Sequence, residues 1–126
     1  METNKLTEQI LKCAYKVHTE LGPGLLETVY ETILARKLEQ QGLRVQRQVP
    51  IPIEFEGEQF DEGFRADLIV ESRVIIELKS VERVSQAHKK QLLTYLKLMD
   101  LKLGYLLNFG EALMKNGITR TINGQL

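Results

Sequence analysis

The feature that most constrains this chain is a pair of short alternating segments, residues 64–70 and 74–79, separated by a few turn residues. Successive side chains of a strand point to opposite faces, so each segment is predicted as a β-strand with one apolar face. A hairpin that pivots on Ser72 pairs the apolar residues of the two segments with one another. We expect one buried face made of Phe64, Ala66, Leu68, Val70, Val74, Ile76 and Leu78. The same register places Asp67 directly opposite Glu77.

Hydrophobic periodicity predicts the remaining elements. Spacings of three and four residues indicate helices, and a period of two indicates strands. Pro50 and Pro52 restrict the strand that begins at Val45 to an edge or a bulged position. In order, we expect helices over 4–21 and 25–41, strands over 45–55, 60–70 and 74–79, a helix over 84–99, and strands over 104–108 and 118–122. The second helix should bury Leu26, Val29, Tyr30, Ile33, Leu34 and Leu38.

The length suits a single domain over residues 1–126, in the α/β (α+β) class with a mixed central β-sheet flanked by helices. The chain has one cysteine, Cys13, and two histidines, so neither a disulfide nor a Cys or His metal cluster is expected. Any metal would be held by oxygen ligands. No apolar run is long enough to span a bilayer and no signal peptide is recognisable, so we expect a cytoplasmic protein without membrane attachment.

Charge is balanced over the chain but segregated along it. The formal net charge is zero, which argues against a broad basic surface that grips duplex nucleic acid. Residues 54–62 hold five acids and no base, whereas residues 79–102 hold six bases and two acids. This pattern fits either a local basic patch or two solvated faces of opposite sign.

The opposed Asp67 and Glu77 need something that offsets their repulsion, since cross-strand neighbours have Cβ atoms only ~5 Å apart. One carboxylate could take up a proton, Lys79 and Arg65 on the same face could neutralise the pair, or a divalent cation could bind between them. Two carboxylates and the Leu78 carbonyl offer hard oxygen ligands that suit Mg²⁺ or Mn²⁺. Lys79 could then orient the attacking water or stabilise charge on a phosphate. The structural alternative is an ion-pair ladder on the sheet surface.

Three motifs in order resemble those of a known family. Asp67 followed by Glu77-Leu78-Lys79 is similar to the PD-(D/E)XK nuclease motif, although Ala66 stands in place of the nominal proline. Residues 91–95, QLLTY, resemble the QxxxY motif of helicase-associated exonucleases in this superfamily. Residues 24–30, GLLETVY, match the signature that names the GxxExxY proteins, which are assigned to the same superfamily. The resemblance covers nearly the whole chain and implies a restriction-endonuclease-like core.

The resemblance also implies roles for individual residues. Glu27 would join Asp67 and Glu77 at the metal, or else serve only as a first-turn acid favoured by the helix dipole. Gln91 would orient a metal-bound water or a phosphate, or be a surface amide. Arg65 would pair with Asp67 or contact phosphate, and Tyr95 would contact substrate. Tyr30 is either a substrate-binding residue or a core aromatic.

Three functions therefore compete. The favoured hypothesis is a Mg²⁺- or Mn²⁺-dependent nuclease that cleaves DNA, or RNA, with Asp67, Glu77, Lys79, Glu27 and Gln91 as catalytic residues. The alternative is a weak or inactive nuclease fold that binds nucleic acid or a partner. A third is a structural protein whose carboxylates are ion-paired. The few bases available for phosphate contacts favour weak or assisted substrate binding, which a homodimer could strengthen.

Overall fold

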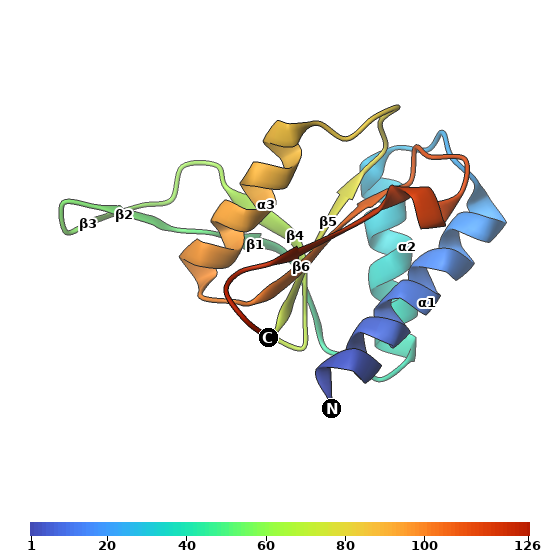
Figure 1. The fold of residues 1–126 in the computed structure, drawn as a ribbon, viewed down its shortest axis with the longest axis horizontal. Helices are drawn as coiled ribbons and strands as arrows, with labels where there is room; N and C mark the ends of the chain where they lie inside the picture. The colour runs from blue at the N-terminus through green and yellow to red at the C-terminus, as the bar shows by residue number, and fades with distance from the viewer.

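The computed structural model describes residues 1–126 and forms a five-stranded mixed sheet between two helical layers (Figure 1). The strand order is β1-β4-β5-β6-β7, in which only β5 and β6 run parallel. The elements are α1 (Thr3–Leu21), α2 (Glu27–Gln40), β1 (Val45–Pro50), β2 (Ile53–Phe55), β3 (Glu58–Phe60), β4 (Arg65–Val70), β5 (Val74–Lys79), α3 (Gln86–Met99), β6 (Leu103–Asn108), the 3₁₀ turn η1 (Met114–Gly117) and β7 (Ile118–Ile122). This architecture confirms the predicted fold class.

The two faces of the sheet are covered by different helices (Figure 1). Helices α1 and α2 cover one face, where a core of 20 buried residues includes Leu68, Val70 and Ile76. Helix α3 covers the other face, where a smaller core of eight residues includes Ile69 and Ile75. Because both faces are buried, β5 is apolar at nearly every position, as expected for a central strand that pairs with a parallel neighbour.

The predicted hairpin register is confirmed where the two strands pair. Leu68 lies opposite Ile76 and Val70 opposite Val74, and the ladder stops there, one position before Asp67 and Glu77. Of the predicted buried face, Ala66 is buried but packs in the core on the α3 side. Phe64 is wrong, because 37% of its surface is exposed. It precedes β4 at the base of a loop, where the strand no longer dictates its direction.

Residues 45–60 depart from the prediction of one long strand. The chain leaves the sheet after Pro50. Strands β2 and β3 then form a separate two-stranded hairpin that projects from the body (Figure 1). We call this hairpin together with its base, residues 51–64, the arm. Neither Pro50 nor Pro52 can donate to a ladder, which explains why pairing with β4 ends here. The predicted edge position of β1 is confirmed.

Helix α2 is turned differently from its predicted stripe. Leu26, Val29 and Ile33 are exposed, and Glu31 and Ala35 are buried in addition to Tyr30, Leu34 and Leu38. Tyr30 explains the rotation, because its ring stacks on Phe109 at 4.5 Å. A helix with apolar residues on more than one face has no unique phase from sequence alone. None of the helices combines the length and the apolar character needed to cross a membrane.

Candidate active site

The site begins where the β4–β5 ladder ends. The backbone N–H of Asp67 donates to the Glu77 carboxylate at 2.7 Å, and the backbone N–H of Leu78 donates to the Asp67 carboxylate at 2.9 Å. Each acid therefore accepts a hydrogen bond from the opposing strand in place of a backbone carbonyl. This reciprocal arrangement fixes the two side chains against each other. Asp67 and Glu77 are brought together as the hairpin register requires.

The other side of Asp67 is formed by a kink in β1. Gln48 has a φ of 50°, in the left-handed region that side chains rarely adopt, and it is skipped in the β1–β4 ladder between Arg47 and Val49. Neighbouring strand residues normally point to opposite faces. At this kink, Arg47 and Gln48 instead both reach the carboxylate of Glu31.

Glu31 on α2 is thereby braced to β1 and linked to the acidic pair. The Arg47 guanidinium contacts one Glu31 oxygen at 3.1 and 3.2 Å, and the Gln48 amide nitrogen donates to the other at 2.6 Å. The same Gln48 nitrogen donates to Asp67 at 3.3 Å. A left-handed backbone at a residue that joins two acids is the kind of strain that collects at functional sites.

No side chain neutralises the acidic pair through a salt bridge. Burial raises the pKa of Glu77 to about 8, with a further contribution from the charge of Asp67. Burial also raises the pKa of Asp67, the Leu78 N–H opposes this, and Glu31 reinforces it. Lys79 lowers both pKa values, yet neither acid forms a salt bridge. Such a pair favours a proton or a cation as its partner.

Lys79 stands at the end of β5, where the chain is anchored on both sides. Glu27 accepts a hydrogen bond from the Ser80 backbone N–H at 3.2 Å. Asn108, at the end of β6, accepts from the Val81 N–H at 3.1 Å and donates to the Val81 carbonyl at 2.9 Å. Glu27 therefore braces the segment after Lys79 and does not reach the acidic pair.

The remaining predicted site residues lie in three different surroundings. The Tyr30 hydroxyl donates to the Gly22 carbonyl and accepts from the Leu25 N–H, and the residue is fully buried, which corresponds to the core alternative. Arg65 is exposed and donates to the Gln48 carbonyl at 3.3 Å. On α3, Gln91 and Tyr95 line one groove. Burial raises the pKa of Tyr95 to about 12, with contributions from the charges of Glu77 and Asp67. Tyr95 packs in the same buried core as Ala66, which precedes Asp67 on β4.

The donor chemistry of this site fits a divalent cation. Its carboxylates are hard oxygen ligands, and burial, together with the neighbouring acids, raises the pKa of both. No three acidic, histidine or cysteine side chains are arranged as a metal-holding group, however. The pair Asp67–Glu77 can supply two ligands, and backbone carbonyls such as that of Leu78, or water, can supply others.

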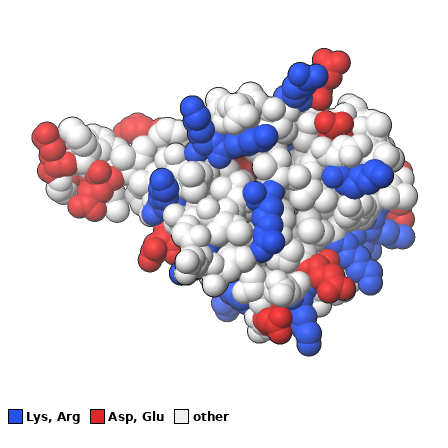
Figure 2. Space-filling model, viewed as in Figure 1, with Lys and Arg blue, Asp and Glu red and all other residues white.

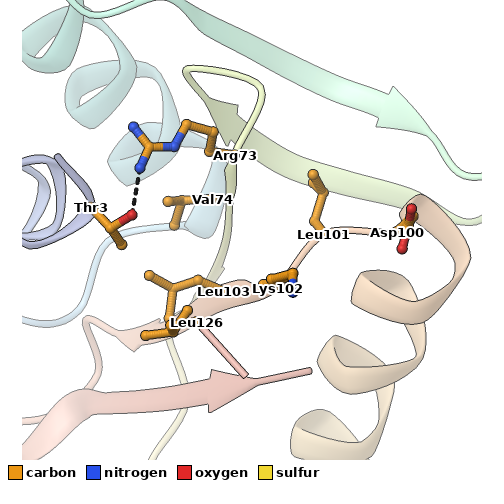
Figure 3. A pocket seen from close by; sticks show the side chains of 8 residues that line it. All are labelled: Thr3, Arg73, Val74, Asp100, Leu101, Lys102, Leu103 and Leu126. Carbon is orange, nitrogen blue, oxygen red and sulfur yellow. Dashed lines mark hydrogen bonds between the residues drawn. The ribbon is translucent and has the colours of Figure 1, made fainter. Parts of the chain in front are cut away.

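A second hollow lies at the opposite end of β5 and β6 (Figure 3). It is lined by the first residues of both strands, Val74 and Leu103, with Arg73 bonded to Thr3 beside it. It holds no cluster of acids. Ligands of sheets with parallel strands gather at the carboxyl ends of those strands, which is the end that carries Glu77 and Lys79.

Sequence reasoning missed three residues of the site: Glu31, Arg47 and Gln48. Glu31 follows Glu27 by one helical turn, so the two acids lie on one face of this helix, although only Glu27 is predicted from the sequence to join the site. The only local signal for the kink is the neighbouring Pro50, which indicates an irregular strand but not a left-handed residue. The convergence on Glu31 depends on the packing of α2 against β1 and could not be read from spacing.

A family model described as the PD-(D/E)XK nuclease superfamily matches residues 4–121, almost the whole chain. The match includes all of the candidate active-site residues. Searches of the curated proteins and of the solved structures found no significant match.

Proposed function

Because the chain belongs to the PD-(D/E)XK nuclease superfamily, we propose that it hydrolyses phosphodiester bonds in DNA, or in RNA, with Mg²⁺ or Mn²⁺ held at Asp67 and Glu77. The observation that carries this proposal is the reciprocal bonding of the two acids across β4 and β5, without a salt-bridge partner. A structural pair of acids would be expected to have an arginine or lysine in contact. Here Lys79 lies on the same face without a salt bridge.

The residues of the site divide into ligands and groups that act on the substrate. Asp67, Glu77 and the Leu78 carbonyl would hold the cation, which supplies a Lewis acid and a bound water of lowered pKa. Lys79 would position the attacking water or stabilise charge on the phosphate. Glu27 holds the backbone just beyond Lys79 with one carboxylate oxygen, which leaves its other oxygen for the proposed role at the metal.

Groups on two other elements are placed to handle the substrate. Gln91 on α3 would orient a phosphate or a water, and Tyr95, which lines the same groove, would contact the substrate. Arg65 is exposed at the start of β4 and would contact phosphate. The GLLETVY motif supports a narrower assignment to the GxxExxY proteins. A cytoplasmic location and a homodimer remain parts of the proposal.

The direct test is cleavage by purified protein. Plasmid DNA, single-stranded DNA and RNA are incubated with Mg²⁺, Mn²⁺ or EDTA, alongside Asp67→Asn prepared identically. We expect cleavage with either metal, none in EDTA, and none with Asp67→Asn. Cleavage by Asp67→Asn at the wild-type rate would contradict the assignment of the site.

A nucleic-acid-binding module without turnover is the second candidate. It is favoured by the absence of a preformed group of three metal-holding side chains. In that case the wild type would bind oligonucleotides and cleave none of them under any metal condition. Binding without cleavage would replace the nuclease proposal with this one.

A further inference from the structure

A groove runs between α3 and the base of the arm, beside the acidic pair. Its lining residues are Ile53, Phe64, Ala87, Lys90, Gln91, Thr94, Tyr95 and Leu98, of which five are hydrophobic. The α3 members recur at spacings of three and one, so they share one face of the helix. Tyr95 lines the groove and packs in the same buried core as Ala66 and Ile75, which lie beside Asp67 on β4 and two residues before Glu77 on β5. The groove is therefore a largely apolar surface next to the candidate active site.

Phe64 gives this groove an open aromatic surface. Its ring meets Tyr95 edge to face, with centroids 6.0 Å apart at an angle of 71°. That contact fixes the ring, although 37% of the residue is exposed. A fixed, exposed aromatic ring offers a face on which a nucleobase can stack.

The two elements that form the groove carry opposite charge. Helix α3 bears Lys89, Lys90 and Lys97, of which Lys90 lines the groove. The arm bears only acids among its charged residues, all of them exposed: Glu54, Glu56, Glu58, Asp61 and Glu62. In Figure 2, acidic side chains cover the projecting arm, and basic side chains lie on the body.

This charge distribution favours single-stranded over double-stranded nucleic acid. A single strand can turn its phosphates to the lysines of α3 and its bases to Phe64. A duplex carries a second chain of phosphates, which would lie against the carboxylates of the arm. Repulsion of the wrong ligand is a common source of specificity.

We infer that the groove binds a single-stranded polynucleotide with a base stacked on Phe64, and that the acidic arm disfavours duplexes. This inference rests on the proposed nuclease function, because the groove lies next to the site of Asp67 and Glu77. Stacking does not depend on the sugar, so single-stranded DNA and RNA are both ligands of this class.

The stacking residue is tested by fluorescence anisotropy in Ca²⁺. The probes are a labelled single-stranded DNA of about 15 nucleotides, the same sequence as RNA, and the DNA duplex. We expect the wild type to bind either single strand at least about 10-fold more tightly than the duplex. Phe64→Ala should weaken single-strand binding about 10-fold, and Phe64→Trp should restore it. Phe55→Ala is the control, because Phe55 lies on the same arm, is 63% exposed and does not line the groove.

The arm is tested separately with Glu54→Gln, Glu56→Gln and Glu58→Gln combined. This variant should bind duplex DNA several-fold more tightly at low salt and bind single strands nearly as before. The control combines Glu2→Gln, Glu8→Gln and Glu39→Gln, which make the same charge change at exposed positions on or beside α1 and α2. That control should not change the preference for single strands.

The outcomes separate this inference from the proposed function. Equal binding of single strand and duplex by the wild type, no binding of either, or equal losses for Phe64→Ala and Phe55→Ala would overturn the inference. A melting curve confirms that each variant is folded. Phe64-dependent binding without any cleavage in Mg²⁺ or Mn²⁺ would uphold the groove and contradict the nuclease function alone.

Discussion

Glu31 and the pair Asp67–Glu77 are neighbouring acids that the fold satisfies in different ways. Glu31 is buried against the Arg47 guanidinium, so its charge is compensated within the protein. Asp67 and Glu77 accept backbone N–H groups and one amide hydrogen, and no side-chain cation pairs with them. A buried acid with an arginine partner supports the fold, whereas two opposed acids without one leave charge for a ligand.

The largest expected effect is on the rate of cleavage, when Lys79, the lysine on the same face as the unpaired acids, is removed. Lys79→Ala should lower the rate of cleavage by ~10² to 10³, because a group that positions water or stabilises developing charge contributes about that much. Stabilisation by Mn²⁺ should be retained, since a lysine does not ligate metal. Kinetics and melting curves are compared with Lys5→Ala, an exposed lysine on α1. Equal cleavage by wild type and Lys79→Ala would assign the activity to another site or to a contaminant.

Loss of the charge partner of Glu31 should lower the stability of the protein. Arg47→Ala leaves Glu31 buried without its cation, and we expect a loss of about 2 kcal/mol in the free energy of unfolding, less than for a wholly buried pair because Arg47 is about half exposed. Lys16→Ala removes the exposed pair with Glu20 and should change stability very little. Urea denaturation measures both. Equal losses would show that burial does not distinguish these two ion pairs.

Gln48 is hydrogen-bonded to both Glu31 and Asp67 and also has a left-handed backbone. The contributions of its side chain and its backbone can be measured separately. Gln48→Gly should be as stable as the wild type or more stable by up to ~1 kcal/mol, because glycine adopts a φ of 50° without strain. Its affinity for Mn²⁺ should fall about 10-fold, as is typical when a residue that orients a ligand is lost. Gln46→Gly, in the regular part of β1, should lower the stability and leave the affinity for Mn²⁺ unchanged. Unchanged Mn²⁺ affinity in Gln48→Gly would make Gln48 a purely structural residue.

The smallest effect expected is on the pH dependence of the metal-free protein. The pKa of Glu77 is raised to about 8 in the folded protein from its ordinary value of 4.5, so the folded state retains a proton that the unfolded state releases. Stability from this group is present in full below 4.5 and is lost as the pH rises through about 8. Melting temperatures in EDTA should fall across this window, and Glu77→Gln should flatten the decline. A wild-type curve that rises between pH 5 and 8 would contradict the assignment.

Local rules were enough to predict the two strands that carry the acids. Alternation and a turn at Ser72 predict the register, which the structure keeps as far as Leu68–Ile76. One position further, hydrogen bonds from the opposing backbone hold Asp67 and Glu77 together. The periodicity of α3 likewise predicts that Leu92, Tyr95, Leu96 and Met99 face inward; the first three are buried, and Met99 is partly buried against the same core. These predictions hold because each depends on residues close together in the sequence.

The parts that could not be predicted depend on long-range packing. The rotation of α2 is set by the contact between Tyr30 and Phe109, which lie far apart in the sequence. That rotation buries Glu31 and turns Glu27 toward Ser80. The left-handed conformation of Gln48 is stabilised by hydrogen bonds to Glu31 on α2 and Asp67 on β4. No sequence pattern within β1 predicts it.

The most direct test of the unpaired acids is the melting temperature of the metal-free protein before and after saturation with Mn²⁺. A ligand that binds only the folded state at 100 times its Kd stabilises it by about 2.7 kcal/mol, which is a rise of several degrees. The wild type and Glu82→Gln, an exposed control, should show this rise, and Glu77→Gln should not. An equal rise in Glu77→Gln, or none in the wild type, would contradict a cation site at Asp67 and Glu77.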